Sequence, residues 1–265
     1  RNLSVGQKLG PVELMPGISR ANAITKLYIS GVSVAALTGM SILQPYILTE
    51  HLDIPRRVQG TLSGDLSFWT EIVMLLLFMP FGILADRIGR RPVYVLGISL
   101  IGLGWGLYPF AGSTMELLFY RLIFAAGVAA TTGTLSTLVN DYPTERSRGK
   151  YIGMTAMLNI LGTIFAARII GGIPEQLSLR GYDAVTGGTV MFTSMAAICF
   201  LTAVIARFGL KAGTPVNKRD RLPARELYKS GLRAARNSRI AFSYAAAMAA
   251  RSDVVIKGLF LALWA

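Results

Sequence analysis

Seven long runs of apolar residues alternate with polar segments along this chain of 265 residues. They cover residues 27–48, 66–85, 93–111, 117–139, 151–172, 189–210 and 240–264. A helix of about 20 residues crosses the roughly 30 Å of hydrocarbon in a bilayer, and the runs have that length. The strands of a membrane barrel would instead show weak alternation over about 10 residues. The pattern therefore predicts an all-α membrane protein with seven transmembrane helices.

The polar segments divide the chain into four parts. They predict an amino-terminal tail (1–23), a bundle of six closely connected spans (24–210), a basic linker (211–239) and a seventh span (240–265). Pro215 and Pro223 interrupt the linker. Its segment 224–236 either lies on an anionic membrane face or forms a solvated helix. A single span after a long linker is expected to be the first helix of a second bundle.

Positive charge is sorted among the connections. The net charge of +13 would suit a nucleic-acid partner, but most basic residues lie in the tail and in the second, fourth and sixth connections. The tail contributes Arg1, Lys8, Arg20 and Lys26. The first, third and fifth connections hold only Arg56, Arg57 and Arg180. Because short loops rich in lysine and arginine stay in the cytoplasm, we expect a multi-pass protein of the cell membrane with a cytoplasmic amino terminus, and no nucleic-acid partner.

The second connection, GILADRIGRRP at residues 82–92, carries an ordered motif. A basic turn alone would account for its arginines, but not for the spacing of Gly82, Asp86, Arg87, Gly89, Arg90 and Arg91. This spacing resembles the loop between spans two and three of the major facilitator superfamily, which lies on the cytoplasmic side. Glycine at position 89 would supply a permissive backbone for the tight turn.

Two further motifs resemble the same family. The fourth connection, DYPTERSRGK at residues 141–150, matches a related loop through Asp141, Pro143, Glu145, Arg148 and Gly149. Arg121 in span four is followed by small residues, as in the family, although Ala125 stands where the family usually has glycine. The Gly-Pro pair of the drug antiporters is absent from span five, which weakens assignment to that subgroup.

The resemblance covers residues 24–265 and implies a secondary active transporter that moves a small solute by alternating access. It implies six helices in two inverted three-helix repeats, with a substrate site near the membrane midplane. The seventh span would open a second half, so about five more spans are expected beyond it. Membrane lipid, a small-molecule substrate and protons or another coupling ion are the expected partners, whereas cofactors, metals and enzyme activity are not expected. Cys199, the single cysteine, is expected to be a buried small hydrophobe.

Polar side chains within the spans are candidates for the substrate or coupling site, because ionisable groups at this depth are costly and usually functional. Counting about 1.5 Å per residue places Glu71, Arg121 and Arg168 in the outer third, at the level of Gln44 and Tyr46. If they converge, Glu71 is a proton-titratable carboxylate held near Arg121. Alternatively, the long arginine stems, that of Arg168 above all, reach out to the outer interface.

The seventh span carries Arg251, Asp253 and Lys257 near its middle. Asp253 and Lys257 are four residues apart and can pair on one helix face, whereas Arg251 needs another partner. The pair is either structural or faces a substrate path between two halves. Together with Arg121 and Arg168, Arg251 points to an organic anion as the solute.

Hydroxyl groups crowd the inner half of span four, at Thr131, Thr132, Thr134, Ser136 and Thr137. They either bond to the backbone of their own helix or line a wet cavity. The residues alone favour neither alternative.

The loop charges are expected to act as a conformational latch. In the resembled family such loops help to hold the two halves together while the site faces outward. Here Asp86 would act with basic residues of the inside loops. The latch set comprises Gly82, Asp86, Arg87, Gly89, Arg90, Arg91, Asp141, Glu145 and Arg148. The alternative is that these charges only set the topology.

Two other functions compete with transport. Asp253, four residues before Lys257 in a seventh span, also resembles the retinal pocket of microbial rhodopsins. A cytoplasmic amino terminus opposes that interpretation, which also leaves the loop motifs unexplained. A facilitator-fold protein that does not transport, such as an assembly factor or a sensor, fits the sequence as a second alternative.

Overall fold

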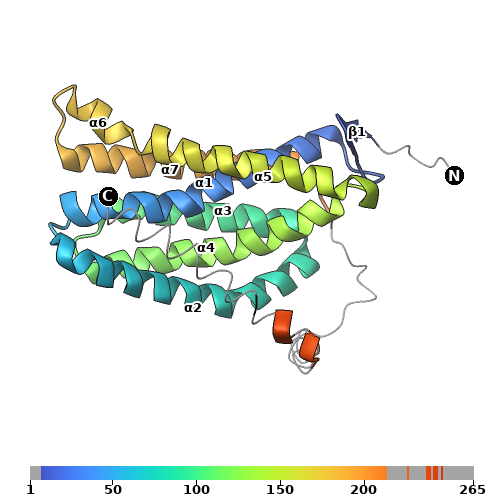
Figure 1. The fold of residues 1–265 in the computed structure, drawn as a ribbon, viewed down its shortest axis with the longest axis horizontal. Helices are drawn as coiled ribbons and strands as arrows, with labels where there is room; N and C mark the ends of the chain where they lie inside the picture. The colour runs from blue at the N-terminus through green and yellow to red at the C-terminus, as the bar shows by residue number, and fades with distance from the viewer. Residues whose placement is uncertain (1–6, 214–225, 227–236, 240, 244–245, 247–265) are drawn as a thin grey trace.

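The computed structural model describes residues 7–213 of the protein, together with residues 226, 237–239, 241–243 and 246. The long helices are α1 (Arg20–Glu50), α2 (Arg56–Ile88), α3 (Arg90–Leu107), α4 (Thr114–Asp141), α5 (Arg148–Ile164) and α7 (Ala184–Gly209). The short segments are η1 (Tyr108–Phe110), η2 (Glu145–Ser147), the π-helical η3 (Phe165–Ile170) and α6 (Ile173–Ser178). The long helices lie side by side along one axis, with η3 and α6 continuing the line of α5 (Figure 1).

Six helical stretches in the described part are long and apolar enough to cross a membrane. They correspond to the first six predicted spans, so the predicted all-α membrane fold is confirmed. The predicted linker and seventh span lie almost entirely outside the described residues. The helices also extend beyond the apolar runs. For example, α2 begins at Arg56, so Arg56 and Arg57 belong to a helix rather than to a loop.

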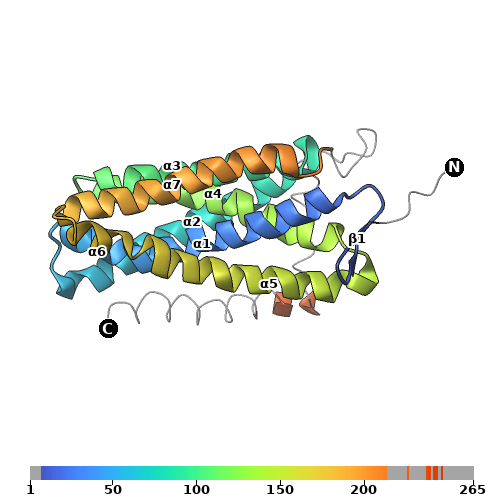
Figure 2. The same cartoon turned by 90° about the horizontal axis from the view of Figure 1, so that it is seen from above.

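The packing of the bundle centres on α3, which packs against α4 and α7. α1 packs against α5 and α7, and α2 packs against α4 (Figures 1 and 2). Glycines allow the closest approaches. A Cβ added to Gly97 of α3 would lie 2.8 Å from the Cβ of Ala130 in α4, and one added to Gly162 of α5 would overlap the backbone of Gly31 in α1. Small residues at such crossings let helices gain dispersion contacts that lipid cannot replace.

Polar tips of aromatic core residues are satisfied by the backbone of α1. The indole Nε1 of Trp105 donates to the carbonyl oxygen of Ala36 (3.2 Å), and the hydroxyl of Tyr151 donates to that of Ala23 (2.9 Å). Both aromatic side chains are fully buried. Cys199 of α7 is a free, fully buried thiol, as its surroundings in the sequence predicted.

A short hairpin precedes α1, in the segment for which the sequence pattern predicts only a tail. It consists of β1 (Lys8–Leu9) and β2 (Val12–Glu13), which pair antiparallel. Leu14 then forms an isolated β-bridge with Pro143, and the amide of Glu13 donates to Ser147 Oγ (3.0 Å). The hairpin thus fastens the chain start to the connection between α4 and α5. We call this side of the bundle the hairpin end, and the opposite side, with α6, the far end.

The first helix begins earlier than predicted because Ser19 caps it. The Ser19 hydroxyl accepts from the amide of Asn22 (3.1 Å), and the Asn22 side chain accepts from the amide of Ser19 (3.0 Å). Such a reciprocal box satisfies two backbone donors that a helix start leaves free. Arg20 and Lys26, both assigned to the tail from the sequence, therefore belong to α1.

Candidate functional site

A polar cluster lies inside the bundle in its far half. Gln44 of α1 is buried, and its Nε2 donates to Ser63 Oγ of α2 (3.0 Å). Its Oε1 accepts from the hydroxyl of Tyr108 in η1 (2.9 Å). The Gln44 amide thereby joins α1 to α2 through Ser63 and to η1 through Tyr108. A buried amide with both ends bonded fixes the relative positions of these elements.

Arg121 of α4 is the charged member of this cluster. Its side chain is 3% exposed, its Nε donates to Thr70 Oγ1 of α2 (3.2 Å), and its guanidinium lies 5.1 Å from the centre of the Phe124 ring. Its Nη1 is buried and has no hydrogen-bond partner in the part of the chain that the structure describes. A guanidinium offers five donors, so Arg121 retains donors for an anionic or carbonyl oxygen.

Glu71 follows Thr70 on α2, and the Thr70 hydroxyl accepts a bond from Arg121 Nε. The Glu71 side chain is exposed, however, and no carboxylate of the described residues forms an ion pair with Arg121. The structure therefore brings Glu71 and Arg121 into the same region without a direct bond between them.

Two other candidates stay apart from this cluster. Tyr46 directs its hydroxyl to the carbonyl oxygen of Ala184 (2.9 Å), which ties α1 to the start of α7. Arg168 of η3 is exposed and forms no hydrogen bond or ion pair with another described residue. That position suits a stem that reaches the membrane interface. Arg251, Asp253 and Lys257 lie outside the described residues.

A cavity of about 330 Å³ opens between α1, α4 and α5 toward the hairpin end. Its polar lining comprises Lys26, Ser30, Ser33, Thr132, Ser136, Thr155 and Asn159. Some hydroxyls of span four bond to the backbone of their own helix, and others line the cavity, so both expected roles occur. Thr134 bonds to the carbonyl oxygen of Ala130 (2.8 Å), whereas Thr132 lines the cavity and Ser136 does both, bonding to Gly133 (2.9 Å).

Lys26 is the functional candidate that sequence reasoning missed. Its side chain is 1% exposed, and its Nζ donates to Thr155 Oγ1 (2.8 Å) and lies 5.0 Å from the centre of the Tyr151 ring. No carboxylate pairs with it among the described residues. The cap at Ser19 was the available signal, because it places Lys26 two turns inside a helix.

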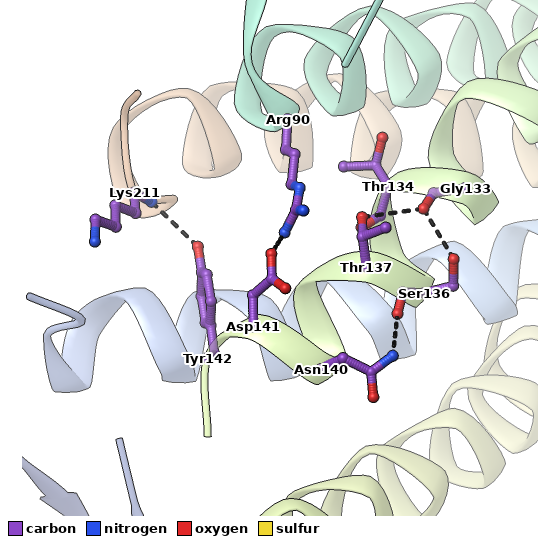
Figure 3. A network of polar contacts seen from close by, with 9 residues as sticks. All are labelled: Arg90, Gly133, Thr134, Ser136, Thr137, Asn140, Asp141, Tyr142 and Lys211. Atoms are coloured by element: carbon purple, nitrogen blue, oxygen red, sulfur yellow. Dashed lines mark hydrogen bonds and ion pairs between the residues drawn. The ribbon is translucent and has the colours of Figure 1, made fainter. Parts of the chain in front are cut away.

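The motif loops meet at the hairpin end, where Arg90 of α3 forms an ion pair with Asp141 of α4 (Figure 3). Beside this pair, the Tyr142 hydroxyl accepts from the amide of Lys211 (3.2 Å), which follows α7. Burial raises the pKa of Tyr142, so the hydroxyl stays neutral. The pair and the tyrosine join the ends of three helices.

The other members of the latch set occupy different positions. Asp86 and Arg87 are exposed, Arg91 is half-buried, and none of them forms an ion pair within the described residues. Asp86 and Arg90 line a small pocket of about 120 Å³ between α2 and α4. On the neighbouring loop, Arg148 lies 3.9 Å from Glu145.

The two glycines of the motif differ in their surroundings. Gly89 adopts φ +100°, and a Cβ there would lie 2.6 Å from the carbonyl oxygen of Gly213. Both its backbone conformation and this contact exclude a larger residue. Gly82 lies on an exposed part of α2, and a Cβ there would meet nothing within 4 Å. Packing within the described part therefore requires glycine at position 89 but not at position 82.

The family model described as Major Facilitator Superfamily matches residues 27–264 of this chain. Magnetosome protein MamH of Paramagnetospirillum magneticum is 28% identical over 89% of this chain and 54% of its own length. Multi-drug resistance efflux pump PmrA of Streptococcus pneumoniae is 26% identical over 73% of this chain and 47% of its own length. The chain thus spans about half the length of these curated relatives.

Among solved structures, the POT family transporter PepTSo shares the fold with a TM-score of 0.57 and 21% identity. The match covers 77% of this chain and 40% of that one. At this identity the likeness concerns the arrangement of helices and says nothing of the solute.

Proposed function

We propose that this chain, which belongs to the Major Facilitator Superfamily, forms the first half of a secondary active transporter that moves a small solute by alternating access. The observation that carries the proposal is the burial of two cationic side chains at two levels of one apolar bundle, Arg121 in the far half and Lys26 near the hairpin end. Ionisable groups buried in a membrane bundle are costly and commonly mark a solute or ion path. Relatives named as efflux pumps and as a niacin/nicotinamide transporter support it.

The proposed solute is an organic anion, with Arg121 as its contact in the far half. The guanidinium retains unpaired donors there, and Gln44 and Tyr108 hold the surrounding helices in place. Proton coupling is part of the proposal. Glu71 is the carboxylate that would take up the proton, because it follows Thr70, whose hydroxyl accepts a bond from Arg121, and its charge would compete with that of a bound anion.

The proposed orientation has the hairpin end in the cytoplasm of the cell and the far end outside. The basic residues of the motif loops support it, because Arg87, Arg90, Arg91 and Arg148 all lie at the hairpin end. Short basic loops are retained on the cytoplasmic side. The second half of the transporter would cover the exposed apolar side chains of α2 and α5.

The loops at the hairpin end are proposed to act as the latch between the halves. The Arg90–Asp141 pair supports this role by holding the α2–α3 and α4–α5 connections together, so that they can move as one body. Asp86 stays exposed beside the pair and is free to bond to the second half. A charge-assisted bond of about 1.5–3 kcal/mol is large enough to shift two states that differ by a few kcal/mol.

A second candidate function is an assembly factor or sensor that uses the same fold without moving a solute. It is favoured by one observation: relatives that cover 89% to 96% of this chain are named as magnetosome proteins and not by a solute. In this case the cluster around Arg121 would be a structural support or a binding site without passage.

Reconstitution of the full-length protein in sealed liposomes separates the two functions. We expect uptake of at least one anionic solute under a proton gradient, and Arg121→Gln is expected to reduce it by about tenfold or more, because a charged hydrogen bond is lost. Arg180→Gln removes an exposed arginine at the far end and serves as the matched control. Absence of uptake for every solute and every ion gradient would favour the second function.

A further inference from the structure

We propose that the cavity between α1, α4 and α5 is a binding subsite for a small organic monocarboxylate, with Lys26 as the residue that holds the carboxylate. This inference rests on the proposed transport function, because it assigns the cavity to the hairpin-end part of the solute path. It adds a ligand class and a contact residue near the hairpin end of the bundle, whereas the Arg121 cluster lies in the far half.

The first argument is the unbalanced charge of Lys26. Its side chain is almost completely enclosed, its Nζ donates to the neutral Thr155 hydroxyl and lies over the Tyr151 ring, and no carboxylate of the described residues pairs with it. A buried ammonium without a counter-charge is costly unless an anion or a proton change compensates it. An ammonium also has three donors, and Thr155 accepts only one of them. A ligand oxygen can therefore complete the set.

The second argument is the lining of the cavity. Thr132 forms no hydrogen bond with another described residue, and Asn159 can donate its amide to the carbonyl oxygens of Thr155 (3.2 Å) and Ser30 (3.3 Å). The Thr132 hydroxyl, which lines the same cavity from α4, is therefore available to a ligand oxygen. The cavity therefore offers a cation on α1 and an unbonded hydroxyl on α4 to the oxygens of a carboxylate.

The third argument concerns charge and size. The lining contains one cation and no carboxylate, so one negative charge balances it and a second one would not be balanced. The apolar part of the lining, which includes Val34, Leu37 and Leu135, favours an apolar body over a second ionic group. A volume of about 330 Å³ lies at the lower end of the range for ligand sites. These properties select a small monocarboxylate over phosphate or a dicarboxylate.

The fourth argument is the distance from the other cationic site. Lys26 precedes Gln44 by 18 residues on α1, which corresponds to roughly 27 Å along a helix. One small solute cannot contact both levels at once. Lys26 would therefore hold the anion at a separate stage of passage, when it enters from or leaves toward the hairpin end.

Binding to the purified full-length protein tests the inference, measured by titration calorimetry with three probes. Benzoate carries one carboxylate on an apolar body, benzamide is its neutral analogue, and inorganic phosphate lacks the apolar body. We expect benzoate to bind wild-type protein about tenfold or more tightly than either of the others, because only it can form a charge-assisted bond in the cavity. Equal binding of benzoate and benzamide would overturn the inference without any variant.

Variants then locate the binding. We expect Lys26→Gln and Lys26→Met to lower the affinity for benzoate by about tenfold or more. Lys26→Arg is expected to keep part of this affinity, and Thr155→Val is expected to lower it less than the Lys26 changes do. Lys150→Gln, which removes an exposed lysine at the same end, is the control. Unchanged benzoate affinity in both Lys26→Gln and Lys26→Met, with monodisperse protein, would overturn the inference.

The outcomes for the subsite and for the transport function are distinguishable. Benzoate binding that depends on Lys26, in a protein that moves no solute in liposomes, would support the subsite and contradict transport. Robust uptake of a solute by the Lys26→Gln variant at the wild-type rate, together with unchanged benzoate affinity, would support transport and contradict the subsite.

Discussion

Arg90, the first residue of α3, forms an ion pair with Asp141, the last residue of α4 (Figure 3). The pair joins the turn after α2 to the start of the connection before α5. Tyr142, the next residue in the chain, accepts a bond from the amide of Lys211 and so holds the end of α7 against the same point. A change at Asp141 is therefore expected to weaken the contacts that hold the ends of α3, α4 and α7 together at the hairpin end.

Asp141→Asn keeps the shape of the side chain and removes the charge that pairs with Arg90. Because the Asp141 side chain is 45% exposed, we expect the free energy of unfolding to fall by only about 0.2–1 kcal/mol. Uptake by the full-length protein is expected to slow by more than this small loss of stability explains. Thermal unfolding and initial uptake rates check both parts. Glu175→Gln, an exposed change in α6, is the control, and equal uptake by the two variants would contradict a role for the pair.

Asp86→Asn tests the latch between the halves. We expect slower transport and a resting population shifted toward the inward-facing state, with insertion and folding largely intact, because Asp86 makes no ion pair within the described residues. Uptake rates and the accessibility of single cysteines placed at the two faces measure this. Asp65→Asn, an exposed change in the same helix, should leave both unchanged. Wild-type uptake and accessibility in Asp86→Asn would show that the charge only contributes to topology.

Gly89→Ala and Gly82→Ala form a matched pair within one motif. Alanine at position 89 must adopt φ +100° and meets the carbonyl oxygen of Gly213, so we expect a loss of about 1–3 kcal/mol in unfolding free energy. Alanine at position 82 meets nothing within 4 Å, and helix propensity there favours alanine by about 0.5–1 kcal/mol. Thermal unfolding of the two purified variants distinguishes them. Equal destabilisation by both would contradict the packing at Gly89.

The stability contributed by Asp183 is expected to depend on pH. Asp183 caps α7, and bonds from the side chain and backbone of Thr186 lower its pKa. A lowered folded pKa means that the carboxylate stabilises the fold at pH values above the ordinary aspartate pKa of about 3.9. This contribution declines as the pH falls through the folded pKa. Thermal unfolding of wild type and Asp183→Asn should therefore differ at pH 7 and converge as the pH falls below the ordinary aspartate pKa of about 3.9.

Thr186→Val provides the control for this dependence, because it removes the hydroxyl bond and keeps the backbone bond to Asp183. We expect the difference in unfolding temperature between pH 7 and pH 3 to shrink in this variant. A difference between wild type and Asp183→Asn that stays constant with pH would contradict the linkage.

Several features of this protein were determined by the sequence alone. The length of the apolar runs dictates helices that cross a membrane, since no other structure satisfies the backbone in hydrocarbon. The ordered spacing of Gly82, Asp86, Gly89 and Arg90 resembles the loop motif of the Major Facilitator Superfamily, and the family model that matches residues 27–264 confirms this resemblance. The burial of Cys199 followed in the same way from its position in an apolar run.

Other features were decided only by the tertiary structure. A span that is apolar on all sides does not show which side faces a neighbour. Counting residues along the spans places Arg121 and Arg168 at the same depth in the membrane. Only the structure shows that Arg121 is buried and Arg168 is exposed. The hairpin contacts join Glu13 to Ser147, 134 residues apart, and no local pattern encodes such a pairing. Lys26 was counted with the tail because its burial depends on α4 and α5, which enclose it from distant parts of the chain. Local sequence sets where helices form, whereas the packing of helices against one another decides which charges they enclose.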